Sequence, residues 1–349
     1  MRVYFYHTQN VQQVLPDYEQ GRFPGHLLYG ATSLAKHGIK VVWHRSLVST
    51  SRFRQIVHAA IEVLRHYREF DAIYASRSQG LDFIVLLRAL RLFPKPIVIW
   101  HHQPISKASS VWRELAARCF YRGYDELFFF SEKLINDSLR SVKARRERMH
   151  LGHWGPDLHF YDTIQQEQVE RRGFVSTGKE MRDMTTLVEA FNRTGAPVDI
   201  YLGRQTGGVN YEELFEHCEK KDNVEVHFVE GLIPYELSKV VHRHQCVVIC
   251  CQQTNYTVGL TTLVEALALG MPVISSRNPQ YPFDIEKDGC GIAVDYYDVD
   301  GWVSAIRYIT THPAEAAQMG QRGRRLAERL YNMEQCAAEV AAVLRKYKG

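Results

Sequence analysis

The chain has no long hydrophobic run. Its densest apolar patch, 83–93, is interrupted by Arg88 and Arg91, whereas a membrane-spanning helix needs about 20 consecutive apolar residues. The first residues, 1–7, read as a short strand and lack the longer apolar core and small-residue cleavage site of a secretory signal. The sequence therefore predicts neither a spanning helix nor a leader peptide.

Paired cysteines are missing as well. The chain has seven cysteines, an odd number, and none stands in a Cys-x-x-Cys pair; they lie at positions 119, 218, 246, 250, 251, 290 and 336. Such scatter indicates neither a zinc cage nor a disulfide framework. Because unpaired cysteines are typical of a reducing compartment, we expect a cytoplasmic protein.

Two further absences narrow the class of protein. No pair of carboxylates has the placement that glycoside hydrolysis requires, and we find no internal repeat or low-complexity tract. The rest of the composition, 45% hydrophobic and 23% charged, is ordinary for a globular enzyme. With 349 residues the chain exceeds the usual size of a single core, which predicts two domains.

Charge is distributed unevenly between the two halves. Residues 1–150 hold 23 Lys and Arg against 12 Asp and Glu, while the remainder holds 20 against 27. A basic half predicts contact with something anionic, usually nucleic acid or an anionic membrane surface. No motif of interleaved aromatic and basic residues supports nucleic acid, so we expect no nucleic-acid partner.

An anionic membrane surface fits the basic half better. A basic run lies next to an expected amphipathic helix, and aromatic residues suited to a membrane interface stand near further cations. The run is Arg140, Lys143, Arg145, Arg146 and Arg148, and the second group is Trp112, Phe120, Tyr121 and Tyr124 with Lys107, Arg113, Arg118 and Arg122. Peripheral attachment to the inner face of the membrane is one interpretation. A solvated basic face without a partner is the other.

Strand-like and helix-like segments alternate along most of the chain. In the first half, strands are expected at 2–7, 40–44, 72–75, 96–100 and 126–130, and helices at 25–37, 52–69, 80–92, 110–122 and 132–141. After a stretch at 149–162 that reads as a linker, strands are expected at 173–176, 198–202, 224–228, 246–251 and 272–275, and 301–348 is almost wholly helical. This alternation predicts an α/β protein of two doubly wound, Rossmann-like parallel-sheet domains facing a central cleft. We place the N-terminal domain at 1–155 and the C-terminal domain at 156–330, with a closing helix at 330–349 that packs back on the first domain.

The most informative stretch is 259–276, which reads as a loop, a short helix, a glycine stop and a buried strand. Its helix starts with Gly259, Thr261 and Thr262, small residues that leave backbone N–H groups free to meet an anion. One turn further on, Glu265 is the only charge of the stretch, and its carboxylate can accept hydrogen bonds from sugar hydroxyls. Phosphate donors followed by a hydroxyl acceptor predict a nucleotide-sugar pocket. The alternative is a buried strand–helix unit with a solvated glutamate.

Several motifs in the second half resemble, in order and spacing, those of the C-terminal domain of GT-B glycosyltransferases. The closest likeness is to the retaining family 4 type, also called glycosyl transferases group 1. The motifs are Gly178-Lys-x-x-Arg182-Asp183 before a helix, Asn223-Val224 with Phe228 and Gly231, the Glu265 stretch with Gly270-x-Pro-Val, and Asp288-Gly-x-Gly291. The resemblance covers roughly 170–340 well and the first half only loosely.

The resemblance implies a phosphate-binding role for the loop after the strand at 173–176. Lys179 and Arg182, which follow Gly178, would stabilise the charge that develops on a diphosphate leaving group, without an obligatory metal. Glu265 resembles the second glutamate of the family's Glu-seven-residues-Glu pattern, which holds the ribose hydroxyls. The alternative for the cationic pair is exposed charge on a strand–helix loop.

The first glutamate of that pattern is absent. Thr257 stands eight positions before Glu265, where the family places a glutamate beside the donor sugar. Its loss implies an altered sugar contact, a shifted register or an inactive scaffold. Since Gln253, Asn255 and Thr257 can still hydrogen-bond hydroxyls, we expect an altered contact; an ordinary polar loop is the alternative.

In the first half, two histidines follow the fourth strand. Resembling enzymes carry a histidine or an acid at the place of His101 and His102, where it touches the donor sugar or the acceptor, and an imidazole there can also ease departure of the phosphate. Side chains alternate along a strand, so one of the two is expected to face the cleft. Gly25 and His26 are assigned to the acceptor side, where the family uses glycine to let the backbone approach its ligands.

The residues and the resemblance together predict a hexosyltransferase. It would move a sugar with retention from a UDP- or GDP-sugar to a hydroxyl of a glycan or lipid-linked saccharide, in polysaccharide biosynthesis, without a metal or other cofactor. Because the leaving phosphate can itself accept the acceptor's proton, no general base is assigned. The alternatives are a nucleotide-sugar epimerase of similar architecture and a non-catalytic GT-B subunit that stabilises a partner enzyme, which the loss of the glutamate at Thr257 would allow.

Overall fold

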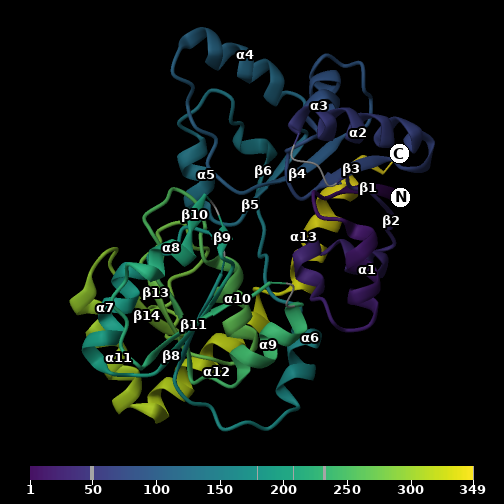
Figure 1. The fold of residues 1–349 in the computed structure, drawn as a ribbon. Helices are drawn as coiled ribbons and strands as arrows, with labels where there is room; N and C mark the ends of the chain where they lie inside the picture. Colours follow the sequence, from purple (N-terminus) through teal and green to yellow (C-terminus); the bar gives the residue numbers. More distant parts are fainter. Residues whose placement is uncertain (48–50, 179, 207, 231–232, 349) are drawn as a thin grey trace. The chain divides into compact units, whose positions relative to one another are not determined.

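The computed structural model describes residues 1–47, 51–178, 180–206, 208–230 and 233–348. The chain folds into two compact units (Figure 1). Unit 1 comprises Met1–Trp154 and Met333–Gly349, and unit 2 comprises Gly155–Asn332. Each unit is built around a six-stranded sheet whose neighbouring strands are parallel.

The sheet of unit 1 has the strand order β2-β1-β3-β4-β5-β6. Its strands are β1 (Arg2–Tyr6), β2 (Lys40–Trp43), β3 (Ala72–Ala75), β4 (Ile97–His101), β5 (Glu126–Phe129) and β6 (Met149–Leu151). Strands β3 and β5 are buried along their whole length, as is typical of parallel strands covered on both faces. The winding reverses between β1 and β3, and doubly wound sheets bind ligands at the carboxyl ends of strands at such a reversal.

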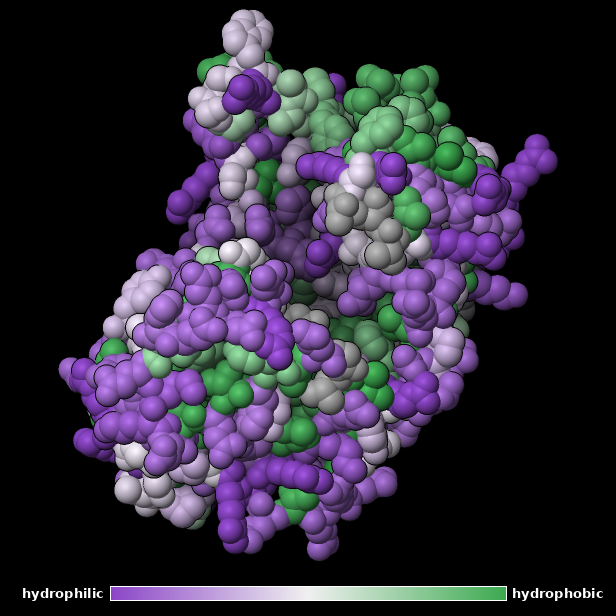
Figure 2. All heavy atoms as spheres, in the orientation of Figure 1, coloured by the Kyte–Doolittle hydropathy of each residue, from purple (hydrophilic) through white to green (hydrophobic). Residues whose placement is uncertain are grey.

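Helices connect the strands of unit 1: α1 (Val11–Glu19), α2 (Arg52–Arg65), α3 (Asp82–Ala89), α4 (Val111–Tyr121) and α5 (Glu132–Ser138). Ser51, Ser110 and Ser131 cap three of them, each hydroxyl accepting a hydrogen bond from the backbone N–H three residues on. Hydrophobic residues gather on the surface over α2 and α3 (Figure 2). Helix α1 lies where the sequence pattern predicts no helix.

One segment of unit 1 forms a different kind of helix from the one that the sequence predicts. The helix predicted at 25–37 is instead two short 3-10 helices, Gly25–Leu28 and Ala31–His37. Tyr29 and Gly30 between them both have positive φ, 55° and 75°, which interrupts an α-helical ladder.

The prediction of a linker at 149–162 is also wrong, because the segment contains a strand and the start of a helix. Strand β6 adds to the edge of the sheet, with Met149 opposite Leu127. Asp157 then caps helix α6 (Leu158–Gln165) of unit 2 by accepting a hydrogen bond from the Phe160 N–H. The aperiodic Gly, His, Trp and Pro content of this segment hid both elements.

The sheet of unit 2 has the order β11-β8-β7-β12-β13-β14. Its strands are β7 (Phe174–Thr177), β8 (Val198–Leu202), β11 (Val224–Phe228), β12 (Cys246–Ile249), β13 (Val273–Ser276) and β14 (Gly291–Val294), and a two-stranded hairpin of β9 (Gln205–Thr206) and β10 (Val209–Asn210) stands apart. The first five of the six were predicted within a residue or two. The sequence pattern missed β14, a short strand that begins with glycine.

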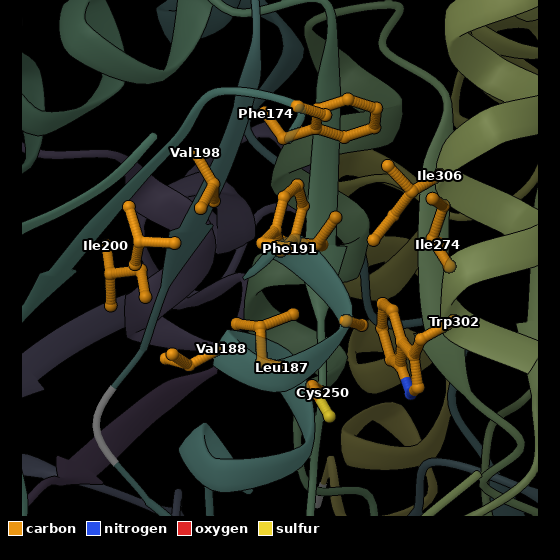
Figure 3. Close-up of a cluster of buried hydrophobic side chains, with 14 of the residues drawn as sticks. Phe174, Leu187, Val188, Phe191, Val198, Ile200, Cys250, Ile274, Trp302 and Ile306 are labelled. Atoms are coloured by element: carbon orange, nitrogen blue, oxygen red, sulfur yellow. The ribbon is translucent and has the colours of Figure 1, made fainter. Parts of the chain in front are cut away.

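Helices cover the unit 2 sheet: α6, α7 (Met184–Thr194), α8 (Tyr211–Glu216), α9 (Pro234–His242), α10 (Leu260–Ala268), α11 (Val299–Thr311) and α12 (Pro313–Arg329). Side chains from α7 and α11 meet those of the central strands in a buried cluster, in which Phe191 and Trp302 lie beside Phe174 and Ile274 (Figure 3). This close-packed layer fixes where β7 ends, and so fixes the loop that follows it.

The chain ends in unit 1. Helix α13 (Met333–Leu344) contacts the 3-10 helix Ala31–His37, and a short 3-10 turn, Arg345–Tyr347, follows it. In this turn Lys346 Nζ and the Tyr347 hydroxyl both bind Glu126 Oε1, at 3.1 and 3.0 Å. Among the described residues, no helix combines the length and apolar character needed to cross a bilayer.

Candidate functional site

The winding of the unit 2 sheet reverses between β7 and β12. These strands pair in parallel, with Phe174 opposite Cys246, and from them the chain proceeds outward in opposite directions. Loops that follow two adjacent strands at such a reversal diverge and leave room for a ligand. The loops at 178–183 and 250–259 are therefore the first place to look for a site.

Backbone hydrogen bonds join these two loops. The Asp183 N–H donates to the Cys250 carbonyl (3.1 Å), and the Gln252 N–H donates to the Met181 carbonyl (2.8 Å). Between these bonds, Arg182 forms an isolated antiparallel bridge with the second loop. The pairing holds one loop against the other, so side chains from both meet at one point.

The Arg182 side chain occupies that point. Arg182 is 5% exposed, and its guanidinium donates to neutral acceptors: the Thr177 carbonyl (3.1 Å), the Glu180 carbonyl (3.2 Å), the Cys251 sulfur (3.1 Å) and the Thr262 hydroxyl (3.3 Å). None of the described carboxylates forms an ion pair with it. A buried charge without a counter-ion costs several kcal/mol, so this position favours binding of an anion. The alternative of an exposed loop charge does not apply to Arg182.

Gly178 makes room for this guanidinium. Its φ is +123°, and a Cβ atom built on it would lie 1.9 Å from Arg182 Nη2. Any side chain at 178 would therefore push the guanidinium out of its place. The sequence motif therefore needs glycine at 178 because the Arg182 guanidinium occupies the space of a side chain.

Helix α10 begins beside the guanidinium. Gly259 at its N-cap offers no side chain to bond the first turn, Thr261 is exposed, and the Thr262 hydroxyl accepts from Arg182. The start of a helix carries unsatisfied N–H groups and a partial positive charge. Arg182 and the first turn of α10 together form a positive region at the reversal of the sheet.

Glu265 lies one turn into α10 and is half-buried. The Tyr161 phenol of α6 is close enough to feel its charge. Burial, followed by the negative charge of Glu265, raises the pKa of Tyr161 well above its usual value, so the phenol keeps its proton beside the carboxylate. Sequence analysis missed Tyr161 because its segment reads as a linker.

The loop before α10 carries the polar residues predicted to touch the sugar. Asn255 is exposed and Thr257 is half-buried. Asn278, directly after β13, donates to the carbonyls of Tyr256 (3.0 Å) and Val258 (3.3 Å) and so fixes the loop from the side. A single asparagine after a strand carries no sequence signal, and its role was missed.

Lys179 lies outside the described residues, so its predicted role remains a prediction. The structure brings three of the other predicted donor-binding residues into direct contact and places the rest on α10 or in the loop before it. The first set is Gly178, Arg182 and Thr262; the second is Asn255, Thr257, Gly259, Thr261 and Glu265.

In unit 1 the structure distinguishes the two histidines at the end of β4. His101 Nδ1 faces the Gln103 carbonyl (3.0 Å), so it carries the proton, and Nε2 accepts from the Tyr121 hydroxyl (3.2 Å). His102 Nε2 donates to the carbonyl of Ser76, which follows β3 (2.8 Å). The proton of neutral His102 is therefore on Nε2, and its Nδ1 is an acceptor. His102 suits the predicted contact with a sugar hydroxyl, whereas both nitrogens of His101 are engaged by protein.

Gly25 and His26, which the sequence assigns to the acceptor side, are buried in the packing of unit 1. A Cβ atom on Gly25 would lie 2.7 Å from the Met333 sulfur and 2.8 Å from the Tyr18 ring. His26 is 0% exposed, and its carbonyl accepts from the Trp154 indole (3.0 Å). The close approach that requires glycine at 25 is to protein atoms.

Part of unit 2 matches a known family. Residues 173–326 match the family Glycosyl transferases group 1, and the matched span contains both paired loops, Arg182 and Glu265. The second unit belongs to the glycosyl transferases group 1.

Relatives of this glycosyltransferase extend the similarity to most of the chain. Over 302 residues it is 24% identical to the MMP alpha-(1->4)-mannosyltransferase of Mycolicibacterium hassiacum, covering 80% of this chain and 71% of that protein. It is similar in structure to sucrose-phosphate synthase from Thermosynechococcus elongatus, with a TM-score of 0.73 and 16% identity over 99% of this chain and 98% of that one. It is also similar to Anabaena Alr3699/HepE in complex with UDP-glucose, with a TM-score of 0.68 and 14% identity over 99% and 100% of the two chains.

These findings confirm the predicted fold, GT-B, with two Rossmann-like parallel-sheet domains. They also confirm the recognition of a group 1 glycosyltransferase, and the family 4-like subclass is consistent with them.

His102 of this glycosyltransferase belongs to a polar group at the carboxyl ends of β1, β3 and β4. Burial, followed by the charge of Arg77, lowers the pKa of His102 to about 4 and the pKa of His7 to about 3, so both are neutral at neutral pH. Burial raises the pKa of the Tyr29 phenol to about 12, and the charge of Arg77 opposes this shift. Sequence analysis missed His7 and Arg77, although each stands within two residues of the end of a buried strand, the signal that singled out His102.

A second polar cluster of the glycosyltransferase lies on β8 and β11. Among the described residues, Asp199, Glu225 and His227 form the one group whose side-chain atoms could hold a metal ion. Asp199 already binds His227 (2.7 Å) and His244 (2.8 Å). These contacts account for the cluster, because they join the edge strand β11 and the residue His244 to the neighbouring strand β8.

A hollow at the far end of α10 has a structural explanation as well. It is lined by cations that satisfy the last carbonyls of the helix. Arg324 and Gln165 donate to the Ala268 carbonyl at 2.8 and 3.0 Å, and Arg171 donates to the Leu269 carbonyl at 2.8 Å. The paired loops at the other end of the helix therefore remain the candidate site.

Proposed function

We propose that this glycosyltransferase transfers a hexose with retention from a UDP- or GDP-sugar to a hydroxyl of a glycan or lipid-linked saccharide, as a step of polysaccharide biosynthesis. We propose further that it requires no metal or other cofactor. The observation that carries the proposal is the buried Arg182 guanidinium beside the first turn of α10, for which no described carboxylate supplies a counter-charge. A diphosphate supplies that charge in two adjacent groups.

Glu265 supports a nucleotide rather than a simple phosphate ligand. Its carboxylate lies one turn beyond the phosphate donors, near the Tyr161 phenol, at a distance along the helix that suits a ribose next to a diphosphate. The similarity to a structure with bound UDP-glucose supports a nucleotide-sugar donor, and the similarity to a mannosyltransferase supports a hexose.

The reaction needs little beyond charge stabilisation. The bond from the sugar's anomeric carbon to the β-phosphate oxygen breaks, and a bond from that carbon to the acceptor oxygen forms on the same face. The acceptor's proton passes to the departing phosphate oxygen. Arg182 and the α10 N–H groups stabilise the negative charge that develops on the phosphate. His102 Nδ1 accepts a hydrogen bond from a hydroxyl of a bound sugar.

A measurement of nucleotide release tests this proposal. The protein is incubated with UDP- and GDP-hexoses in the presence and absence of saccharide acceptors, and the released nucleoside diphosphate and the anomeric configuration of the product are measured. Acceptor-dependent release with a retained configuration supports the transferase.

Thr257 in place of the family's glutamate favours one alternative, a non-catalytic subunit. Nucleotide binding without release under any acceptor would establish that alternative. Conversion of the donor sugar to its epimer without acceptor would instead establish an epimerase.

A further inference from the structure

Exposed apolar side chains are concentrated on three helices of unit 1. Of the large hydrophobic residues exposed in the described part of the chain, fourteen lie in unit 1 and two in unit 2, so the feature distinguishes one unit from the other. Eleven of them form what we call the apolar face: Phe53, Val57, Ile61, Leu64, Phe83, Leu86, Leu90, Leu92, Val111, Trp112 and Leu115.

The spacing of these residues on α2 shows that one side of this helix is apolar and exposed. On α2, Phe53, Val57, Ile61 and Leu64 follow one another at intervals of three or four residues, which places them on one side of the helix. Helix α2 contacts α3, and α3 contacts α4. Figure 2 shows hydrophobic residues gathered over α2 and α3 and extending toward α4, at the top of the view.

Helix α4 is turned with its apolar residues outward. All residues of this helix are described, and the buried one among them is the acidic residue Glu114. Glu114 Oε2 accepts from the Ala108 N–H (2.6 Å), and Oε1 accepts from the Ser141 hydroxyl, so polar contacts attach the helix to unit 1. Trp112, in contrast, is 81% exposed. A soluble surface rarely leaves a contiguous apolar area of this kind without a partner.

Basic residues surround the apolar face. Residues 51–122 contain twelve Lys and Arg against five Asp and Glu. Two of the acids on these helices are neutralised within the face, Glu62 by Arg65 (2.6 Å) and Asp82 by Arg52 (2.8 Å). The surplus of positive charge is therefore available to an anionic partner.

A small basic pocket lies at the carboxyl end of α4. Five cations line it, with two tyrosines and a leucine and no carboxylate among its described lining residues: Arg118, Arg122, Lys143, Arg145 and Arg148. Guanidinium groups converging on one hollow are suited to a phosphate group. The pocket adjoins the apolar face because α4 contributes to both.

We propose that the apolar face and the basic pocket of unit 1 bind an anionic phospholipid bilayer. The apolar side chains enter the boundary between headgroups and acyl chains, and the cations meet lipid phosphates. A second copy of this chain is a poorer partner, because it would bring a second basic surface against the first. The inference gives a location to the lipid-linked acceptor of the proposed function but does not depend on the donor site.

The structure also refines which residues make the contact. Among the aromatic residues singled out in the sequence, Trp112 is exposed, whereas Tyr124 is buried at 3% exposed. Helices α2 and α3 were not singled out in the sequence, because the basic run and the aromatic group lie elsewhere. They nevertheless contribute most of the apolar face. Trp112 and the two arginines of the pocket from α4 are therefore the residues to alter.

Flotation of the full-length protein with vesicles tests the proposal. We compare vesicles of phosphatidylcholine alone with vesicles that also contain phosphatidylglycerol, and expect flotation with the second. The double variant Trp112→Ser, Leu115→Ser is expected to bind at least tenfold more weakly. In the double variant Arg118→Ala, Arg122→Ala, binding falls by about fivefold for each charge removed, equivalent to about 1 kcal/mol. Tyr308→Ser, at an exposed aromatic residue of unit 2, is the matched control and floats like the wild type.

Three results would overturn the proposal. The first is no flotation with phosphatidylglycerol vesicles at low salt. The second is equal flotation of the wild type and both double variants, each with an unchanged melting temperature. The third is a stable dimer in light scattering that the Trp112→Ser, Leu115→Ser variant dissociates, which would assign the apolar face to a second copy of the chain. Donor-dependent nucleotide release measured without vesicles reports on the transferase separately.

Discussion

Arg182 has the most constrained environment of any single residue in the candidate site. Its guanidinium is buried among carbonyl, hydroxyl and thiol acceptors, so its position is fixed before any ligand arrives. A fixed donor loses little conformational entropy when an anion binds. This preorganisation is what a site needs if it is to stabilise charge on a leaving group.

Replacement of Gly178 by alanine tests that positioning. The new Cβ would overlap the guanidinium, so we expect Gly178→Ala to lose most of the stabilisation that UDP or GDP gives in a thermal melt. Gly195→Ala is the matched control, because Gly195 also has positive φ (+69°) but nothing within 4 Å of a Cβ atom. Both variants lose about 1 kcal/mol of stability from backbone strain. Equal nucleotide responses in the two would contradict the role of Arg182.

Glu265 and Tyr161 allow a test of the ribose contact. Glu265→Gln removes a charged acceptor and is expected to weaken nucleotide binding by about 1.5–3 kcal/mol, while leaving the binding of inorganic pyrophosphate unchanged. Tyr161→Phe removes the hydroxyl near the carboxylate and should weaken nucleotide binding less. Calorimetric titration of both ligands measures the difference, and an equal loss for nucleotide and pyrophosphate would place Glu265 outside the ribose contact.

The buried histidines of unit 1 predict acid sensitivity. Burial, the largest cause in each case, lowers the pKa of His7 and His44 to about 3 and that of His102 to about 4, from 6.5. A histidine with a lowered folded pKa binds protons better in the unfolded chain, so stability is full above pH 6.5 and falls as the pH drops toward 4.

Urea unfolding at several pH values measures this loss. The free energy of unfolding should fall by up to about 1.4 kcal/mol per pH unit for each histidine involved. The His102→Asn variant should show a shallower slope between pH 6.5 and 5. A free energy that does not change over this range would show that the three imidazoles take up protons equally in the folded and the unfolded protein.

At the scale of elements, the strands were predicted best and the irregular helices worst. Strands such as β4 and β12 are apolar runs rich in β-branched residues, of the kind that parallel sheets bury on both faces, so their composition alone locates them. The segment 25–37 has helical spacing, but Tyr29 and Gly30 take positive φ where the chain packs on α13. That conformation depends on tertiary contacts, which periodicity does not record.

The contact of α13 with unit 1 makes a prediction for stability. Ala337 is buried, and a Cβ atom on Gly30 would lie only 3.0 Å from its Cα, so the helix has no room for a larger side chain. Ala337→Leu is expected to destabilise the protein by about 1–3 kcal/mol, measured by urea unfolding. Ala342→Leu, at an exposed position of the same helix, is the control and should change stability by less than about 0.5 kcal/mol.

At the scale of the whole molecule, the sequence motifs locate the donor loops but not the residues from other segments that contact them. Gly178, Arg182 and Glu265 stand in motifs of recognisable spacing. Tyr161 and Asn278 reach the site from distant segments, and only the fold brings them there. The choice between the two histidines at the end of β4 likewise required their hydrogen-bond partners, because alternation along a strand shows that they differ but does not show which one keeps a ring nitrogen available to a ligand.

The unequal charge of the two halves of the sequence corresponds to a difference between the two units. The basic half folds into unit 1, whose apolar face is flanked by cations, whereas the unit with the paired loops exposes few large apolar residues. This division assigns surface attachment to one unit and donor binding to the other.

Calorimetric titration of the wild-type protein with nucleotides tests the central claim most directly, that a diphosphate binds at Arg182 and the start of α10. UDP and GDP are each compared with their nucleosides in the presence of EDTA. We predict that one of the diphosphates binds at least a hundredfold more tightly than its nucleoside, and that Gly178→Ala abolishes this difference while Gly195→Ala preserves it. Equal affinity for nucleoside and diphosphate, or an undiminished difference in Gly178→Ala, would contradict the account.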